Sequence, residues 1–406
     1  MVYTSCSLKL KDHYKDLIGE ISMNNIKNFF GDNFFKEHFG INYLYKANFM
    51  DNFESMMNLD ILDSMLSKTN IWNNQNFMMM LDQKPLSYSD YTSLSLDLNG
   101  QNFRPDVNKV QKLVSKGASI ILNDIQKHNS HLLQFVSELQ KLTNGRCQGN
   151  LYFSMASHQA FGPHFDFHDV FAIHFEGEKV WNIYENIEKN PINHPAFKFS
   201  GEERIKRAGK IIDQVILKPG DLLYIPRGQY HDALASKNGA IHIAFGLTYL
   251  KNIDCMNSLW QNLILNEFMR KDIGVNPSSE EIKTLLKKLS HELNDIINSS
   301  KALESVKENI KNWQYPIQEY SIKTIVSEGP SYLIDNSIKF ETKEGKPYLT
   351  SAKGSVQIPG KFKSLIEFII EQESINEKSL KAQFQDISDD IIIECLENLK
   401  KMNVIK

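Results

Sequence analysis

Residues 150–181 read NLYFSMASHQAFGPHFDFHDVFAIHFEGEKVW, and this stretch decides the fold. It begins and ends with runs of apolar and aromatic residues, which are divided by FGPH at 161–164 and by EGEK at 176–179. Two similar runs follow downstream, QVILKPGDLLYIP and AIHIAFGLTYL. Successive short strands with glycine-marked turns and no intervening helices predict an antiparallel sandwich or barrel.

Helical patterns lie on both sides of this β-rich part, so the predicted class is α+β. Residues 29–50 predict a helix with an aromatic face and a short strand, and residues 110–142 predict helix, strand and helix. After Leu250, SSEEIKTLLKKLSHELNDII repeats apolar residues at helical spacing, and Ser278 with Glu281 forms a capping box. A β-like stretch then leads to helices expected near 361–372, 376–385 and 388–402.

Composition places the chain among ordinary globular proteins. It has 406 residues, of which 41% are apolar and 23% charged, and its formal net charge is −3. This balance lacks the basic excess typical of a dedicated nucleic-acid binder. The four cysteines are scattered without a CxxC pair, which favours a reducing, cytoplasmic location. The N-terminus lacks the apolar core of a signal peptide and no apolar run is long enough to span a membrane, so no membrane partner is expected.

The strongest chemical signal is His164-Phe165-Asp166 together with a later histidine, His231. On a strand, His-x-Asp points both side chains to one face, because side chains alternate. His231 ends the run PGDLLYIPRGQYH, whose glycine, proline and histidine spacing matches the second metal-binding motif of cupin barrels. Two imidazoles and one carboxylate leave three open positions on one side of a metal, as in non-haem Fe(II) oxygenases. The alternative is that these side chains belong to the core and are satisfied by hydrogen bonds.

Other polar residues near this motif need separate interpretation. His168 shares the expected strand face of His164 but would lie roughly 13 Å along it, too far to bind the same ion. Lys179 ends the turn EGEK and is either a solvated turn lysine or an ammonium inside the barrel. Inside, it would bind the far carboxylate of a 2-oxo dicarboxylate that chelates Fe(II). A structural role is expected for the histidines without a partner at useful spacing, His158, His174, His194 and His242.

The segment 150–181 resembles the core of the JmjC-type ribosomal oxygenases, the cupin-4 group of Fe(II)/2-oxoglutarate-dependent oxygenases. In that family a strand with N-x-Y precedes P-H-x-D, and E-G-x-K-x-W follows. The matching residues are Asn150, Tyr152, His164, Asp166, Lys179 and the later His231. Many members carry HYDD where this chain has HFDF, so Phe167 changes the wall beside the metal, which bears on the choice of substrate.

The resemblance implies a double-stranded β-helix, the cupin or jelly-roll barrel of JmjC type. It implies that His164, Asp166 and His231 bind Fe(II) and are the catalytic residues. It also implies that Lys179, fifteen residues after the first metal histidine, holds the 5-carboxylate of 2-oxoglutarate. The further residues expected to line the co-substrate pocket are Asn150, Tyr152 and Thr248.

The same resemblance implies three parts: an oxygenase domain with N-terminal helical elements over 1–250, a helical dimerisation region over 251–325, and a winged-helix-like domain over 326–406. A homodimer is therefore expected. Residues 331–406 hold 11 Lys and Arg against 12 Asp and Glu, and the expected third helix opens with Asp389 and Asp390. Acids at the end of a recognition helix are repelled by phosphate, so duplex DNA is not an expected partner.

The expected function is hydroxylation of an amino-acid side chain in a protein, such as a ribosomal protein, or in a peptide. Fe(II) would be the metal, and 2-oxoglutarate and dioxygen the co-substrates. Three alternatives stay open: an N-methyl-lysine demethylase, a tailoring hydroxylase of peptide natural products, and a non-catalytic cupin sensor or regulator. A Lys179 placed for 2-oxoglutarate would argue against the sensor, because a sensor of another ligand has no need of it.

Overall fold

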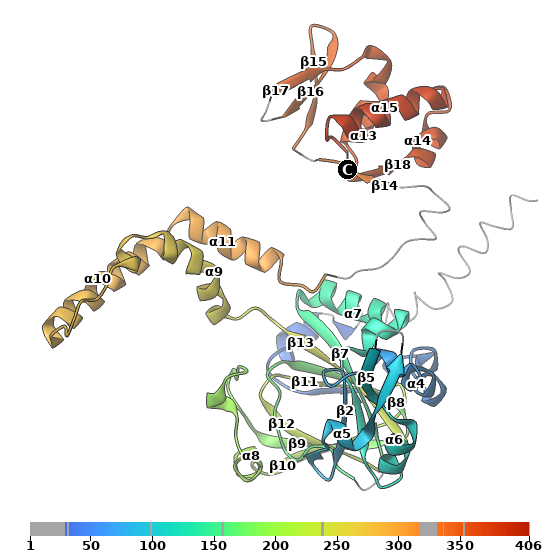
Figure 1. Ribbon diagram of the computed structural model, residues 1–406, viewed down its shortest axis with the longest axis vertical. Helices are drawn as coiled ribbons and strands as arrows, with labels where there is room; N and C mark the ends of the chain where they lie inside the picture. Colours follow the sequence, from blue (N-terminus) through green and yellow to red (C-terminus); the bar gives the residue numbers. More distant parts are fainter. Residues whose placement is uncertain are drawn as a thin grey trace, which may run out of the picture. The chain divides into compact units, whose positions relative to one another are not determined.

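The structure is a computed structural model, and it describes residues 29–30, 32–97, 100–155, 158–236, 239–316, 331–335, 337–351 and 354–405. The N-terminal stretch expected to lack a signal peptide, with Cys6, lies outside these residues. The chain divides into two compact units, Met1–Ile317 and Gln318–Lys406, and each is described by itself (Figure 1). None of the described helices is both long and apolar enough to cross a membrane.

Two antiparallel sheets form the centre of the first unit. The larger has the strand order β1-β11-β8-β13-β7-β6-β2-β3, and the smaller has the order β10-β9-β12. The predicted antiparallel β architecture is therefore confirmed. The strands of the larger sheet are β1 (Leu44–Lys46), β2 (Phe77–Leu81), β3 (Lys84–Pro85), β6 (Ser119–Leu122), β7 (Arg146–Ser154), β8 (Asp169–Glu176), β11 (Leu222–Ile225) and β13 (Ala240–Thr248). Those of the smaller sheet are β9 (Lys179–Ile187), β10 (Ile211–Leu217) and β12 (Gln229–Ala235).

Strand β8 shows that the larger sheet has two buried faces. Phe171 and Ile173 belong to a large core on the outer side, which also contains side chains of the N-terminal helices. Val170 and Ala172 alternate with them and pack on the inner side, where Trp181 of the smaller sheet joins the same cluster. A strand covered on both faces reads as a continuous apolar run, which explains the sequence VFAIHF.

The outer core is rich in aromatic side chains. The rings of Phe34 and Tyr224 are 4.9 Å apart and those of Phe30 and Phe171 are 5.4 Å apart, so the aromatic face expected near 29–50 packs against the sheet. The elements of this N-terminal part are α3 (Asp32–Glu37), η1 (Phe53–Ser55), α4 (Leu59–Leu66), η2 (Thr69–Ile71), α5 (Tyr88–Tyr91), β4 (Thr92–Asp97), β5 (Gly100–Pro105), α6 (Val107–Val114), η3 (Ile125–His128) and α7 (Ser130–Thr143).

The β-rich part departs from the prediction in that helices interrupt it. The short helices η4 (Pro195–Phe197) and α8 (Gly201–Ala208) lie between β9 and β10. Helix α8 buries only its last residue, so it lacks the apolar periodicity by which helices are recognised. Its ends supply the stabilisation instead. Ser200 caps it by accepting the Glu203 amide at 3.2 Å, and acids in its first turn and bases in its last turn complement the helix dipole.

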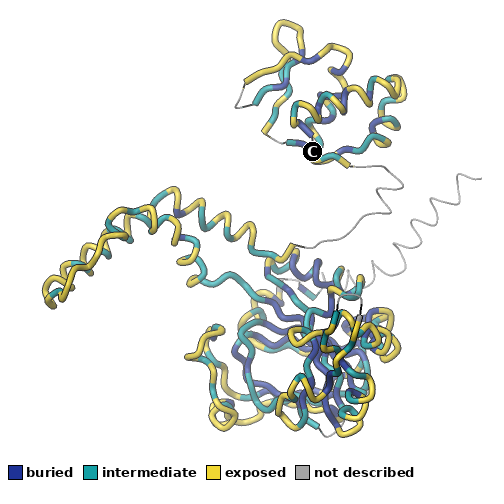
Figure 2. Tube along the Cα trace, in the orientation of Figure 1, coloured by how far each residue is buried: buried dark blue, intermediate teal, exposed yellow. Residues whose placement is uncertain are grey.

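Three longer helices follow the barrel: α9 (Asn252–Leu265), α10 (Ser279–Ile297) and α11 (Ser300–Lys311), with the short η5 (Phe268–Arg270). The capping box predicted for α10 is present. The Ser278 amide donates to Glu281 at 2.7 Å, and the Ser278 hydroxyl accepts from the Glu281 amide at 3.3 Å. Most residues of these helices are half-buried or exposed (Figure 2). Large apolar side chains are among the exposed residues, including Trp260 and Leu265 of α9.

The second unit has a small core of its own. Phe362, Leu365, Ile392 and Leu396 are buried together within it, and the three α-helices of its described part lie close to the ranges expected from the sequence. Its strands are β14 (Ser331–Leu333), β15 (Lys339–Lys343), β16 (Lys346–Ser351), β17 (Gly354–Gln357) and β18 (Ser374–Asn376). Its helices are η6 (Gly360–Phe362), α13 (Lys363–Ile370), α14 (Glu377–Gln383) and α15 (Asp389–Lys401).

Candidate active site

His164, Asp166 and His231 lie together in the first unit. One nitrogen or oxygen atom from each lies within 4.8 Å of the others. Nε2 of His231 is 3.5 Å from Oδ2 of Asp166, and the two imidazole centroids are 4.5 Å apart. His231 is held in β12 opposite Ile183 of β9, and a single antiparallel bridge joins it to His164. The structure thus brings the three predicted metal ligands to one point.

Hydrogen bonds determine which nitrogen of each histidine is free. Nδ1 of His164 lies 2.9 Å from the Gly162 carbonyl oxygen, and Nδ1 of His231 lies 2.9 Å from that of Gln229. Because a carbonyl oxygen only accepts, Nδ1 carries the hydrogen in each neutral ring and Nε2 carries the lone pair. Burial, and then the nearby His164, lowers the pKa of His231 to about 4. Such neutral, oriented imidazoles are what a metal requires.

Asp166 is held in its ionised form. Burial acts to raise the pKa of its carboxyl, but the electrostatic influence of His168, His164 and His231 outweighs burial and holds the pKa below its usual range. This influence places His168 in the neighbourhood of Asp166. Residues 165–168 lie outside the strands, so the expectation that His-x-Asp and His168 share one strand is wrong. The chain bends at Phe167 and His168 instead, because the bridge to His231 is only one residue pair long.

Lys179 is buried inside the barrel, only 4% exposed, which excludes the solvated turn lysine. Its ammonium donates to the Ser154 hydroxyl at 3.1 Å and to Nδ1 of His242 at 3.3 Å. No carboxylate in the described part of the chain forms an ion pair with it. Burial alone lowers the pKa of Lys179 to about 7. A buried cation without a counter-ion is costly, so the site is suited to an anion.

Strand register relates Lys179 to the metal ligands. Lys179 pairs with Ala235 and His231 pairs with Ile183, so both side chains occupy the same face of the smaller sheet, about 13 Å apart along the strands. Trp181 occupies the inward position between them, and its indole ring stacks on His231 at 5.8 Å. The buried indole Nε1–H has no hydrogen-bond partner among the described residues, which leaves a donor for a bound molecule.

Tyr152 and Asn150 lie on the side of β7 that faces this interior. Tyr152 pairs with His242 of β13, and the two rings stack with centroids 4.8 Å apart. Burial, and then the Asp166 charge, raises the pKa of Tyr152, so its hydroxyl is a neutral donor. Asn150 precedes it by one inward position and accepts the Asp124 amide at 3.3 Å. Their expected role in the co-substrate pocket stays a prediction.

Thr248 does not join this cluster. It is six residues beyond His242 on β13, about 20 Å along the strand, and it pairs with Arg146 at the far end of β7. The inward positions between them are Ala244 and Gly246, which carry no hydroxyl. The structure therefore does not bring the Thr248 hydroxyl to Lys179.

Three residues of the site were not anticipated from the sequence: Ser154, Trp181 and His242. His242 was expected to be structural, yet its ring contacts Lys179 and lies 5.2 Å from the Trp181 ring. Burial, then the charge of Lys179, holds its pKa well below the ordinary value, so His242 is a neutral acceptor. The sequence signal that was available for two of them is the alternation of side chains along a strand. Ser154 lies four residues after Asn150, and Trp181 lies two residues after Lys179, so the members of each pair point to the same face.

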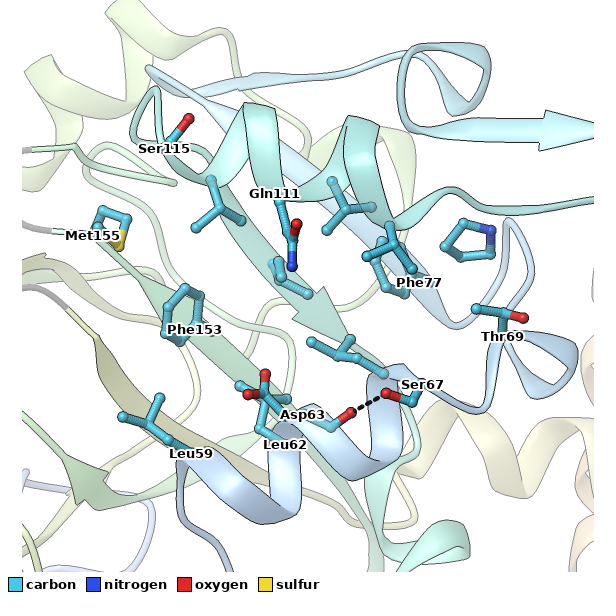
Figure 3. A pocket seen from close by; sticks show the side chains of 16 residues that line it. Leu59, Leu62, Asp63, Ser67, Thr69, Phe77, Gln111, Ser115, Phe153 and Met155 are labelled. Carbon is cyan, nitrogen blue, oxygen red and sulfur yellow. Dashed lines mark hydrogen bonds between the residues drawn. The ribbon is translucent and has the colours of Figure 1, made fainter.

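A separate apolar pocket lies on the other face of β7 (Figure 3). It has a volume of about 580 Å³, and Phe153 lines it beside Leu62 of α4 and Gln111 of α6. Phe153 follows Tyr152 in the strand, so the two side chains point to opposite faces of the sheet. This pocket is therefore not part of the site that contains the triad.

The donor set of the triad fits a divalent transition metal such as Fe(II). Two neutral imidazoles and an ionised carboxylate converge, and the second nitrogen of each ring is already hydrogen-bonded. A buried ammonium lies on the same sheet face. The arrangement therefore defines a class of protein, in which a metal site inside a β-barrel adjoins a pocket for an anion.

Comparison with known proteins specifies this class. Residues 122–254 match the family model described as the JmjC domain, and they contain the triad and Lys179. This match confirms the resemblance predicted from the motifs.

Curated relatives carry names from the same group. The bifunctional lysine-specific demethylase and histidyl-hydroxylase NO66 of Dictyostelium discoideum is 30% identical over 238 residues, which make up 57% of this chain and 42% of that protein. Ribosomal oxygenase 1 of Rattus norvegicus is 30% identical over 141 residues, or 34% of this chain and 23% of that protein. The chain thus spans less than half the length of these relatives.

Among solved structures, the X-ray structure of Escherichia coli ycfD is similar over 92% of this chain and 97% of that chain, with a TM-score of 0.49 and 16% identity. Another structure of that protein, a ribosomal oxygenase in complex with cobalt and 2-oxoglutarate, gives a TM-score of 0.48 and 15% identity over the same shares.

Proposed function

We propose that this chain is an Fe(II)- and 2-oxoglutarate-dependent oxygenase that hydroxylates an amino-acid side chain in a protein or peptide. The observation that carries the proposal is the position of Lys179. It is a buried ammonium without a described acidic partner, on the same sheet face as His231 and about 13 Å from it. A short dicarboxylate that chelates a metal at the triad would present its far carboxylate to this lysine.

His164, Asp166 and His231 are the residues that would hold the iron. When bound there, iron(II) couples the oxidative decarboxylation of 2-oxoglutarate to the insertion of one oxygen atom of O₂ into a C–H bond. The Nδ1 hydrogen bonds leave Nε2 of both imidazoles free, and these atoms would hold the ion. The triad leaves the remaining positions on one side for co-substrate and dioxygen.

The residues between the triad and Lys179 bind and orient the co-substrate. Lys179 donates to the far carboxylate, and the neutral His242 and Ser154 hold its ammonium in place. Tyr152, Asn150 and the unpartnered indole of Trp181 supply further polar contacts. Trp181 and Tyr152 also fill the interior with aromatic rings, which excludes water from the reacting centre.

The substrate proposed is a protein or peptide. The named relatives support this class, since one is called a histidyl-hydroxylase and the other a ribosomal oxygenase. Demethylation of N-methyl-lysine is the second candidate, because the name of the first relative includes that activity and the same iron chemistry supports it. Tailoring of a natural-product peptide and a sensory role are weaker candidates.

Mass spectrometry of proteins captured from the native lysate separates these candidates. Incubation with the Fe(II)-loaded chain, 2-oxoglutarate and ¹⁸O₂ should add one ¹⁸O atom to a specific residue of one captured protein. Formaldehyde release with loss of a methyl group would identify a demethylase instead. No modification of any captured protein under conditions in which the chain binds 2-oxoglutarate would contradict an oxygenase acting on protein.

For the rest of the chain we propose the three parts given above, 1–250, 251–325 and 326–406, with dimerisation through the second and a winged-helix-like third part in a cytoplasmic protein. Exposed apolar residues such as Trp260 and Leu265 support the dimer, because pairing would bury them. In the third part, Lys381 is paired with Asp389 and Glu377, which supports the absence of duplex DNA binding since this cation is already neutralised.

A further inference from the structure

A second hollow lies beside the triad, distinct from the interior that contains Lys179. Its volume is about 680 Å³, and its wall includes Phe167, His168 and Asp169, which directly follow Asp166. Arg227 also lines it, and the next residue, Gly228, donates its amide to the Asp166 carbonyl at 3.1 Å. Two chain segments therefore connect this hollow to the backbone of a candidate metal ligand.

Two cations, Arg227 and Lys251, line the hollow. The Arg227 guanidinium donates to the neutral Asn190 side chain at 2.8 Å, and the Lys251 ammonium donates to the Tyr249 carbonyl at 3.2 Å. Neither cation forms an ion pair with a carboxylate in the described part of the chain. Both therefore retain donors and charge for a ligand.

The acids nearby are already engaged. Asp169 is buried, and its two oxygens accept the Arg227 backbone amide and the Tyr224 hydroxyl, each at 2.9 Å. Asp254 accepts the backbone amide of Lys251 at 2.8 Å, and no ion pair joins it to the ammonium. These hydrogen bonds engage the two carboxylates. The charge of Asp169 acts on Arg227 and that of Asp254 on Lys251, but neither acid forms an ion pair with these cations, whose side-chain donors remain available to a ligand.

The two cations lie close enough to influence each other. Burial, and then the charge of Arg227, lowers the pKa of Lys251. Lys251 also precedes the first turn of α9, a helix of 14 residues, and Asn252 and Ile253 from that turn line the hollow. The positive end of the helix dipole therefore adds to the two side-chain charges. A bound anion would relieve their repulsion.

We propose that this hollow binds a carboxylate of the peptide substrate, from an acidic residue that flanks the residue presented to the triad. Arg227 and Lys251 are its ligands, and Phe167, Ile192 and Leu250 provide apolar wall for the neighbouring part of the peptide. This inference rests on the proposed function, because it assumes that the substrate is a peptide. It narrows the substrate class to segments with an acidic flank.

The test is equilibrium binding of fluorescein-labelled peptide libraries to the full chain loaded with Mn(II) and 2-oxoglutarate without dioxygen, so that nothing turns over. Each library is centred on His, Arg or Lys and has one flanking position fixed as Asp, Glu, Asn or Gln. An acid at one flanking offset should bind about tenfold tighter than its amide counterpart. Libraries with free and amidated C-termini distinguish an acidic side chain from a terminal carboxylate. Tighter binding only in libraries with the free C-terminus would overturn the recognition of an acidic flanking residue.

Variants assign the effect to the two cations. Arg227→Gln and Lys251→Gln should each abolish most of the preference for acidic peptides, while Arg227→Lys should retain part of it. Lys210→Gln, an exposed lysine outside the hollow, is the matched control and should retain all of it. Equal binding of acidic and amide peptides by the wild-type chain, or a preference that survives in the double variant, would overturn the inference.

Calorimetric binding of 2-oxoglutarate to the same Mn(II)-loaded protein tests the proposed function separately. Binding of 2-oxoglutarate with no preference for acids would overturn the carboxylate site alone. A preference that depends on Arg227, without any binding of 2-oxoglutarate, would support the carboxylate site and overturn the proposed oxygenase.

Discussion

The backbones of His164 and His231 hold each other by a reciprocal pair of hydrogen bonds. The amide of His164 donates to the carbonyl of His231 at 3.0 Å, and the amide of His231 donates back at 2.8 Å. This bridge uses backbone atoms alone, and it brings together two imidazoles whose centroids are 4.5 Å apart and whose Nδ1 atoms are hydrogen-bonded elsewhere. The metal site is therefore arranged by the backbone before an ion binds.

Replacement of one imidazole should remove the metal and leave the fold. For His164→Ala, the bridge to His231 persists because it uses only backbone atoms. Mn(II) affinity should fall by more than the roughly 10–100-fold that accompanies loss of an outer hydrogen-bond partner. Electron paramagnetic resonance of free Mn(II) measures this, with thermal unfolding as the check on the fold. His158→Ala, which removes a half-exposed imidazole paired with Asp82, is the control and should bind Mn(II) normally.

Loss of the Lys179 ammonium should weaken 2-oxoglutarate without weakening the metal. Lys179→Met removes a charge-assisted hydrogen bond pair, on the order of 1.5–3 kcal/mol, so the affinity for 2-oxoglutarate should fall about 10- to 100-fold. Calorimetry on the metal-free protein measures the affinity for Mn(II), and calorimetry on the Mn(II)-loaded protein measures the affinity for 2-oxoglutarate. An unchanged affinity for 2-oxoglutarate in Lys179→Met would show that Lys179 does not bind the co-substrate.

The affinity for 2-oxoglutarate should fall as the pH rises through about 7. Burial gives Lys179 a pKa of about 7 in the ligand-free protein. A bound carboxylate favours the charged ammonium and raises that pKa, so the complex holds more protons than the free protein between the two values. Calorimetry at about pH 8 in two buffers of different ionisation enthalpy should report uptake of a proton on binding. Lys179→Arg stays charged at this pH and should abolish the uptake; uptake that persists in this variant would assign the proton to another group.

The exposed apolar residues of α9 should be covered by a second copy of the chain. Trp260 is 61% exposed and Leu265 is 73% exposed. Light scattering should give the mass of a dimer, and Leu265→Glu should shift it toward the monomer because a charge would be buried at the interface. A monomeric mass for the wild-type chain at micromolar concentration would refute the dimer.

Local patterns in the sequence were sufficient for much of the fold. The capping box of Ser278 and Glu281 depends on residues three apart, and the structure contains both of its hydrogen bonds. The strands with alternating or continuous apolar residues were also recognisable. Helix α8 was not, because a polar helix that buries one residue has no apolar period.

The metal triad could be predicted from the sequence because the spacing of its motifs indicates how the three side chains are arranged. The contacts around Lys179 could not be predicted in this way. Contact of His242 with Lys179 depends on the register of β13 against β7, which pairs His242 with Tyr152. Sequence separation does not determine that register, since a shift of one residue would turn His242 to the other face. Thr248 shares the parity of His242, and only its position along the strand excludes it.

Formation of succinate from 2-oxoglutarate is the most direct measurement of the central claim. The wild-type chain with Fe(II), dioxygen and a captured substrate should produce succinate, and one oxygen atom should appear in the substrate for each succinate formed. Anaerobic samples and Asp166→Ala should produce none above the rate of free iron. Equal succinate formation by wild-type and Asp166→Ala protein would contradict the assignment of this site as the centre of an Fe(II)- and 2-oxoglutarate-dependent oxygenase.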